Sequence, residues 1–222
     1  MQTSLSAFSA SLFLVFALSL GGCGVNYVSG TISPHFAEYS IKKVAVLPFR
    51  TQPVFLDGRI SVTPQVGEGS DRLLAKIFTE RLRETGKFQV IPQEQVEAAM
   101  EDLKKAAEEG SEAITTSFAQ KVGKALGTDA VITGEVQAFT ERKGGTQAIE
   151  RPATVGFVAQ MMNVNDGRLL WSSEYYETQK ALTEDVDTLP LFWKRGGKWL
   201  TARELAEYGV EEMIITLPKA RE

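Results

Sequence analysis

The sequence predicts a single mixed α/β domain whose elements follow the order β-α-β-α-α-β-β-β-α. In the first half, short apolar runs alternate with segments whose apolar residues recur every three or four positions. In the second half, three β-rich runs follow one another, which is typical of antiparallel strands beside a helical layer. The composition agrees, because 222 residues with 43% hydrophobic and 23% charged side chains suit one globular domain.

The first 22 residues differ from the rest of the chain and predict a cleaved export signal. No charged side chain precedes Glu38, and the apolar run of residues 12–20 is followed by the small residues Gly21 and Gly22. This run is shorter than the roughly 20 apolar residues that a membrane-spanning helix needs. Residues 1–10 contain no Lys or Arg, whereas an export signal normally begins with positive charge. A start codon further upstream would supply that charge.

The segment Leu20-Gly21-Gly22-Cys23 resembles a bacterial lipobox, in which small residues precede a cysteine that is acylated before cleavage. The resemblance implies that Cys23 carries palmitate-type chains as the first residue of the mature protein. Gly24 implies sorting to the periplasmic face of the outer membrane, in a source that has two membranes. The alternatives are a plain secretory signal with a chance cysteine, or a buried hydrophobic anchor. Since Cys23 is the only cysteine, an internal disulfide and a CxxC metal site are excluded.

Residues 23–40 are polar and turn-rich and predict a lipidated tether, so the α/β domain is expected over residues 41–222. Residues 42–49 form an apolar run that predicts a central strand buried on both faces. After a loop over residues 50–69, Ser70 or Asp71 is expected to cap a helix that ends at Gly86.

The middle of the chain predicts one strand and two helices. The strand covers residues 87–91, and Pro92 opens a charged helix that runs to about Glu109. A third helix is expected to start at Ser111 or Glu112 and to stop at Gly127.

The second half predicts three strands and a last helix. The strands cover residues 129–142, 153–164 and 168–176 and form an antiparallel meander; the first loop is residues 143–152, and the second turn contains Asp166-Gly167. The helix runs from about Thr201 to Pro218. We expect the apolar faces to meet in one core that includes Val44, Val46, Leu74, Ile77, Phe118, Val122, Val131 and Met213.

Three segments resemble a known family. They are residues 44–49, 86–91 and 126–136, and residues 164–171 add a hairpin of the form strand, D-x-x-G, strand. In order and spacing they are similar to the α/β domain shared by the N-terminal domain of TolB, the lipoprotein CsgG and the LpoB-type activators of penicillin-binding proteins. The resemblance covers about residues 42–176 and implies a TolB-N/CsgG-like fold. Its motifs are structural, and Gly86, Gly127 and Gly134 are each explained by helix ends or close packing.

The sequence lacks the residues of an enzyme site. The single histidine, His35, lies in the expected tether, and the chain has no GxSxG, P-loop, GxGxxG or HExxH motif. Paired acids such as Glu211 and Glu212 point in different directions on a helix and indicate a solvated face. We therefore expect no catalytic residue, metal site or cofactor. A net charge of −4 and a pI near 5.3 argue against nucleic-acid binding.

The segment from Leu189 to Leu200 is the best candidate for a contact surface. Aromatic and cationic side chains flank a Gly-Gly pair there, which predicts a short hairpin, and both types are common anchors of interfaces and membrane surfaces. The alternative is that its aromatic residues only cover the sheet or the last helix. The candidate contact residues are Phe192, Trp193, Lys194, Arg195, Lys198 and Trp199.

The family resemblance and the lack of catalytic motifs together predict a non-enzymatic lipoprotein. It would act as an adaptor or assembly factor in secretion, assembly or cell-wall synthesis. Its partners would be the membrane, through the lipid, and envelope proteins. The alternative is an oligomeric CsgG-like secretion channel subunit, and an enzyme is the third hypothesis. A membrane-spanning hairpin needs about 20 residues, whereas residues 143–152 are ten and rich in charge. A soluble homo-oligomeric ring remains compatible with the sequence.

Overall fold

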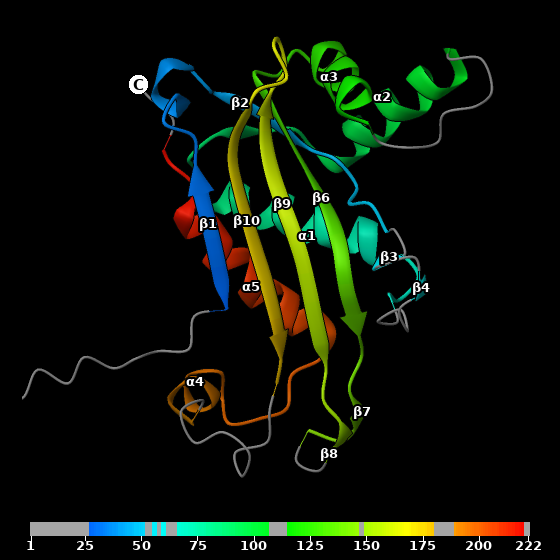
Figure 1. The fold of residues 1–222 in the computed structure, drawn as a ribbon, viewed down its shortest axis with the longest axis vertical. Helices are drawn as coiled ribbons and strands as arrows, with labels where there is room; N and C mark the ends of the chain where they lie inside the picture. Colours follow the sequence, from blue (N-terminus) through cyan, green and yellow to red (C-terminus); the bar gives the residue numbers. More distant parts are fainter. Residues whose placement is uncertain are drawn as a thin grey trace, which may run out of the picture.

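A six-stranded mixed sheet forms the centre of the protein, with the strand order β1-β10-β9-β6-β2-β5 (Figure 1). The structure is a computed structural model that describes residues 27–51, 55–56, 59–60, 66–106, 115–146, 149–179 and 189–219. The expected export signal and Cys23 lie outside the described residues.

Four strands make the antiparallel part of the sheet. β6 (Ala130–Thr140), β9 (Thr154–Asn163) and β10 (Leu169–Thr178) form the predicted meander, and β1 (Val28–Ile32) pairs with the free side of β10. At the predicted β9–β10 turn, the Asn163 side chain accepts the backbone N–H groups of residues 165 and 166, and the next glycine has φ 71°.

The parallel part of the sheet is short. β2 (Lys43–Val46) lies between β6 and β5 (Gln89–Val90) and is parallel to both. The Asp129 carboxylate accepts the backbone N–H groups of Lys42 and Lys43 at 2.9 and 2.8 Å. It therefore joins the start of β6 to the start of β2.

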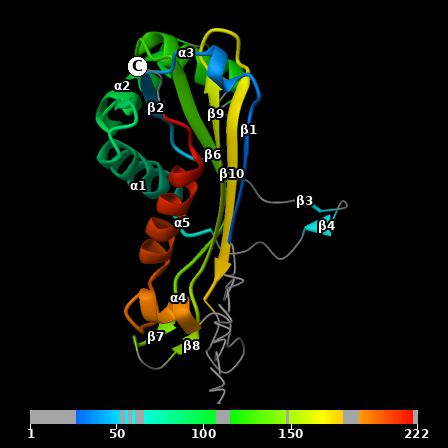
Figure 2. The same cartoon turned by 90° about the vertical axis from the view of Figure 1, so that its left-hand side faces the viewer.

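The helices cover the two faces of the sheet unequally. α1 (Ser70–Glu84) and α5 (Ala202–Thr216) lie side by side along one face, as Figure 2 shows. α2 (Gln93–Ala106) and α3 (Thr116–Ala125) pack together and against β2 and β6. Their contacts leave most of the long β6, β9 and β10 strands uncovered on that face.

The described residues form two core clusters, not the single core that was expected. Val44 and Val46 of β2 join the cluster beneath α1 and α5, whereas their neighbours Ala45 and Leu47 join the cluster beneath α2 and α3. Successive side chains of a strand point to opposite faces, so β2 is buried on both sides as predicted. The expected core residues divide accordingly: Leu74, Ile77 and Met213 lie in the first cluster, Val122 and Val131 lie in the second, and Phe118 is only partly buried beside the second.

Three predicted helix ends are confirmed, whereas the expected end near Glu109 and the expected start at Ser111 or Glu112 lie outside the described residues, and Thr115 caps α3. Gly86 and Gly127 follow helices with φ of 63° and 61°, and Thr201 forms a capping box with Glu204 at the start of α5. The N-terminus of α1 differs, because the residue that precedes the helix is Gly69, with φ 77°, and no side chain caps it. The expected cap Ser70 is the first helical residue.

Several elements were absent from the prediction. Within the expected tether of residues 23–40, β1 and a short 3-10 helix, η1 (Phe36–Glu38), belong to the fold, and Phe36 is buried. The described part of the fold therefore includes Tyr27 and β1 and does not begin near Ile41. The expected loops contain two small hairpins, which are β3 (Phe55–Leu56) with β4 (Arg59–Ile60), and β7 (Lys143–Gly144) with β8 (Ile149–Arg151).

Close packing at Gly134 of β6 gives a first testable prediction. A Cβ atom at this position would lie 2.2 Å from Cε1 of Phe49 and 2.5 Å from the Val158 carbonyl oxygen. Gly134→Ala is therefore expected to lower the free energy of unfolding by about 1–3 kcal/mol, as overpacking does in other cores. Denaturant unfolding measures the loss, and Gly67→Ala is the control because its Cβ would make ordinary contacts of 3.5 Å or more. Equal stabilities of the two variants would contradict the packing described for Gly134.

Candidate functional site

The predicted contact segment forms a helix and a glycine turn at one end of the sheet, and not the hairpin that was expected. α4 (Leu189–Lys194) ends in a turn in which the Gly197 N–H donates to the Phe192 carbonyl at 2.9 Å. Gly196 and Gly197 have φ of 86° and 65°, which favour the end of a helix. Pro190 is the second residue of α4, near the position where proline is best tolerated in a helix. The glycine pair therefore ends a helix, whereas the sequence was interpreted as two strands around a turn.

Three aromatic rings of this segment contact one another. The Phe192 ring meets those of Trp193 and Trp199 edge-on, with centroids 6.1 and 6.5 Å apart. Phe192 and Trp199 are half-buried, whereas Trp193 is 66% exposed and lies against Gly197, where a Cβ atom would come within 3.2 Å of the indole. Trp193 is thus a large apolar side chain held at the surface by its neighbours.

Arg195 is buried and is not available as a contact residue. Its guanidinium binds both carboxylate oxygens of Glu177 at the end of β10, and the two residues are 7% and 3% exposed. The hydroxyl of Tyr175 donates to the same carboxylate at 2.6 Å, and the Tyr208 ring of α5 lies 4.8 Å from the Arg195 Cζ atom. Burial raises the pKa of Tyr175, so its phenol remains a donor. This buried ion pair fastens the end of α4 to the sheet.

Gln179 makes a second link between the sheet and the segment. Its amide nitrogen donates to the Lys198 carbonyl at 3.0 Å, and its amide oxygen accepts the Leu200 N–H at 2.8 Å. The Lys198 ammonium pairs with Glu204 of α5 at 2.6 Å. Of the six predicted contact residues, Trp193 and Lys194 are exposed, Phe192, Lys198 and Trp199 are half-buried, and Arg195 is buried.

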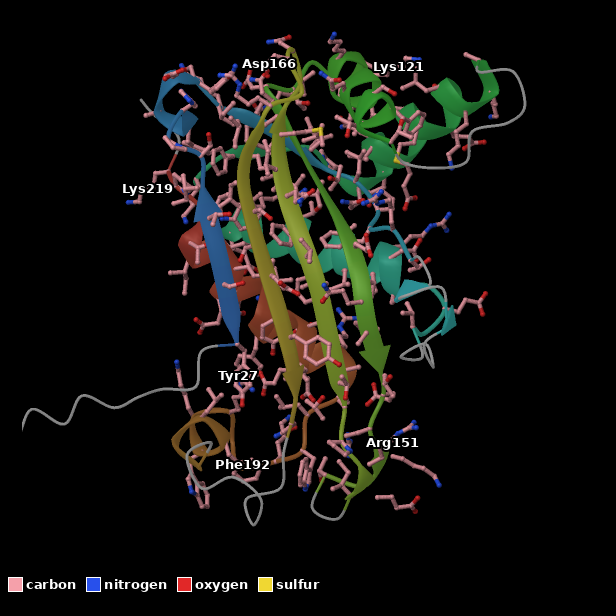
Figure 3. The ribbon with its side chains drawn as sticks, viewed as in Figure 1. Tyr27, Lys121, Arg151, Asp166, Phe192 and Lys219 are labelled. Carbon is pink, nitrogen blue, oxygen red and sulfur yellow. The ribbon has the colours of Figure 1, made fainter. Side chains whose placement is uncertain are left out.

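The α4 segment lies at the end of the molecule where the described chain begins. Figure 3 shows Tyr27, directly before β1, and Phe192 of α4 at the same end of the sheet, while Lys121 and Asp166 lie at the opposite end. Tyr27 follows Cys23 by four residues. An extended chain spans at most about 3.6 Å per residue, so the four residues from Cys23 to Tyr27 can span at most about 14 Å.

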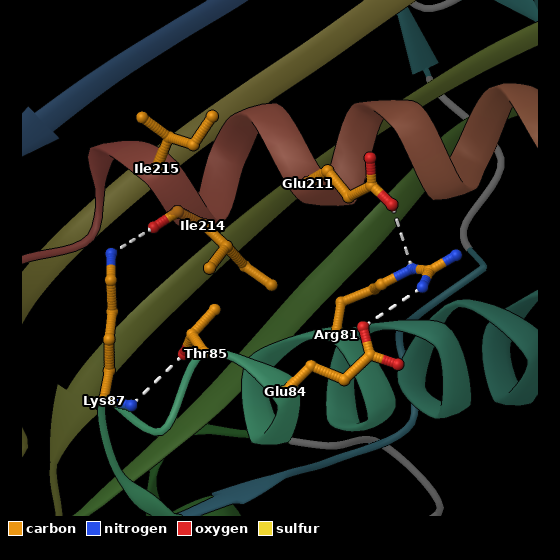
Figure 4. A pocket seen from close by; sticks show the side chains of 7 residues that line it. All are labelled: Arg81, Glu84, Thr85, Lys87, Glu211, Ile214 and Ile215. Carbon is orange, nitrogen blue, oxygen red and sulfur yellow. Dashed lines mark hydrogen bonds and ion pairs between the residues drawn. The ribbon is translucent and has the colours of Figure 1, made fainter.

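A hollow of about 310 Å³ lies elsewhere, between the C-terminal ends of α1 and α5 (Figure 4). Its cations are already engaged: Arg81 pairs with Glu84 and Glu211, each at 3.1 Å, and the Lys87 ammonium donates to two backbone carbonyls at the end of α5, each at 2.6 Å. Burial lowers the pKa of Lys87, and the charge of a nearby lysine adds to this effect. The lining holds no nucleophile with a base beside it.

The described residues contain no arrangement suited to catalysis. His35 lies on the surface, where its Nδ1 atom pairs with the Glu38 carboxylate at 2.7 Å. Across residues 27–219, gaps excepted, no group of three or more His, Cys, Asp or Glu side chains is placed to hold a metal ion. No helix in the described part of the chain is long and apolar enough to cross a membrane.

Residues 70–176 match the family model described as the peptidoglycan-synthase activator LpoB. The match begins at α1 and ends within β10, so it includes the meander and leaves out α4 and α5. No curated protein sequence matches the chain significantly.

Several solved structures are similar to this chain at low sequence identity. A variant PelC dodecamer from Paraburkholderia phytofirmans matches with a TM-score of 0.52 and 16% identity over 87% of this chain and 98% of that chain. Another PelC dodecamer from that organism matches with a TM-score of 0.49 and 15% identity over 88% of this chain and 98% of that chain. The LpoB C-terminal domain from Salmonella enterica matches with a TM-score of 0.39 and 17% identity over 64% of this chain and 85% of that chain. At these identities the first match shows the fold alone.

Proposed function

We propose that this chain, which contains an LpoB-like domain over residues 70–176, is a lipid-anchored, non-enzymatic adaptor of the bacterial cell envelope. The match to the model of a peptidoglycan-synthase activator carries the proposal, because such an activator acts by binding another protein. A peptidoglycan synthase is accordingly the first partner to test.

The proposed anchor is Cys23 at the periplasmic face of the outer membrane. Two or three acyl chains give stable anchoring, whereas one gives only marginal binding. The short distance from Cys23 to Tyr27 would keep the α4 end of the domain close to the lipid surface. This end carries the exposed Trp193, so the contact surface would face the membrane or a partner bound beside it.

Replacing Trp193 tests this contact surface. Trp193→Ala is expected to weaken capture of a purified peptidoglycan synthase by the immobilised mature chain about 30-fold, because a buried interface Trp supplies roughly 2 kcal/mol. The melting temperature should stay within about 1 °C, since the side chain is 66% exposed. Lys121→Ala, at the far end of the molecule, should bind like the unmodified chain.

The same variant distinguishes the two candidate partners of the surface. If Trp193 contacts lipid, Trp193→Ala weakens binding of the unlipidated domain to phospholipid vesicles and leaves synthase capture unchanged. A lower melting temperature of Trp193→Ala, with normal capture and normal vesicle binding, would mean that Trp193 only packs against its own domain and contacts no partner.

The fold similarity to a PelC dodecamer favours a second candidate, a subunit of a closed oligomer. This candidate corresponds to the channel alternative. Native mass spectrometry of the mature chain separates the two candidates, because an adaptor is expected as a monomer and a channel subunit as a closed ring.

A further inference from the structure

The two edges of the sheet are built differently. β5 forms one edge and has only two residues; Gln89 and Ile91 turn their N–H groups toward β2, with bonds of 2.8 and 2.9 Å. Val90 is left as the strand residue that faces outward, and Pro92 follows closely. A very short edge strand near a proline is protected from pairing with other chains. This edge cannot accept a further strand of useful length.

β1 forms the other edge and lacks this protection. Its five residues, VSGTI, contain neither charge nor proline. Ser33 N–H donates to the Leu170 carbonyl at 2.9 Å, and the antiparallel register pairs Thr31 with Ser172. Because antiparallel residues alternate in the direction of their backbone bonds, Ser29 and Thr31 face β10, and Gly30 and Ile32 turn their N–H and C=O groups outward. Within the described ranges, no other strand lies on that side.

The side chains at this edge leave apolar surface for a neighbour. A Cβ atom at Gly30 would lie 3.2 Å from the Thr216 hydroxyl of α5, so position 30 faces the helix side, and the side chain of Ile32, two residues on, points the same way. Ile32 lies opposite Trp171, which is 1% exposed, yet Ile32 itself is 50% exposed. A strand placed beside β1 would cover Ile32 and continue the apolar layer.

We propose that β1 binds an extended segment of a partner protein as a seventh strand of the sheet, with apolar residues at alternate positions on its helix side. The backbone groups of Gly30 and Ile32 would bind the segment by main-chain hydrogen bonds, and the edge of the apolar layer would select its side chains. This inference rests on the proposed adaptor function, because it assumes a protein partner in the envelope.

A second copy of the chain fits this edge poorly. The two-residue β5 of another copy offers only Val90, and a β1–β1 pair would be antiparallel. Centred on Gly30, such a pair would place the two Tyr27 ends about 20 Å apart along the strands, at 3.4 Å per residue. With the strands upright on the membrane, the four residues from Cys23 to Tyr27 span at most about 14 Å, so both anchors could not reach the same lipid surface.

Photo-crosslinking in envelopes tests the proposal with the full lipidated chain. We expect p-benzoylphenylalanine at position 32 to form an adduct with another envelope protein, and mass spectrometry to map the adduct to a segment with alternating apolar residues. The same probe at position 121, on α3, should not form it. An adduct with a second copy, with a segment lacking that alternation, or with no protein at all would overturn the proposal.

Backbone variants then test the strand geometry with a synthetic peptide of the mapped segment. Ile32→Pro removes an outward N–H and should weaken binding at least tenfold with little change in melting temperature. Thr31→Pro removes an N–H bonded to β10 and should lower the melting temperature by several degrees. N-methylation of those alternate peptide amides that face β1 should also abolish binding. Full binding by Ile32→Pro or by the methylated peptides would exclude strand addition.

The outcomes separate this proposal from the proposed function. Synthase capture without a position-32 adduct would reject the strand site alone. An adduct from another protein, without synthase capture, would reject the synthase as the partner and leave the strand site in place.

Discussion

Replacing Arg195 with methionine is expected to lower the free energy of unfolding by about 3–5 kcal/mol, because it leaves the buried Glu177 carboxylate without its partner. For a domain of this size the melting temperature should fall by roughly 6–20 °C. Thermal unfolding followed by circular dichroism measures the effect. Tyr175 would remain the donor to Glu177, but its neutral hydroxyl cannot balance the charge.

Lys198→Met is the matched control in the same segment. The Lys198–Glu204 pair is about half exposed, so its loss should cost less than about 1 kcal/mol. Adding Glu177→Gln to Arg195→Met removes the unpaired charge and should restore at least 1 kcal/mol. Equal effects of Arg195→Met and Lys198→Met would show that the buried pair does not hold α4 to the sheet.

Replacing Cys23 with serine is expected to remove the lipid and to release the protein from the membrane fraction. The acyl chains supply the anchoring energy, roughly 0.8 kcal/mol for each buried CH₂ group, and no described helix is long and apolar enough to replace them. Palmitate labelling and envelope fractionation measure the change.

The domain itself should be unaffected by Cys23→Ser, because Cys23 precedes all the residues that the structure places in the core. Its melting temperature should therefore equal that of the unlipidated mature chain. Palmitate labelling that persists in Cys23→Ser would contradict the assignment of the lipid to this residue.

Elements with strong local signals were predicted from the sequence. The meander followed from β-rich runs around Asp166-Gly167, and α5 followed from its apolar spacing and from Thr201 at its start. The division of the core was missed because the apolar stripe of a helix does not show which face of a sheet it covers. Phe118 and Leu74 have similar spacing signals but lie on opposite sides of β2.

β1 was missed because its sequence resembles a linker. Ser29, Gly30 and Thr31 are small or polar, and their place in the sheet depends on pairing with residues 172–174, more than 140 positions away. Such pairing is not visible in local composition.

The contact segment was proposed from its composition, which does not show where each of its side chains lies. Trp193 is exposed as a contact surface requires, whereas Arg195 pairs with a carboxylate 18 residues earlier in the chain. A sequence shows that Glu177 and Arg195 have opposite charge, but not that strand and helix bring them together in the interior.

The rate of glycan-strand polymerisation by a purified peptidoglycan synthase tests the central claim most directly. The lipidated chain and the synthase are placed in the same phospholipid vesicles, with the synthase alone and the chain alone as references. The account predicts a higher initial rate with both proteins and no product from the chain alone. An unchanged rate in the presence of the folded chain, or product formed by the chain alone, would contradict it.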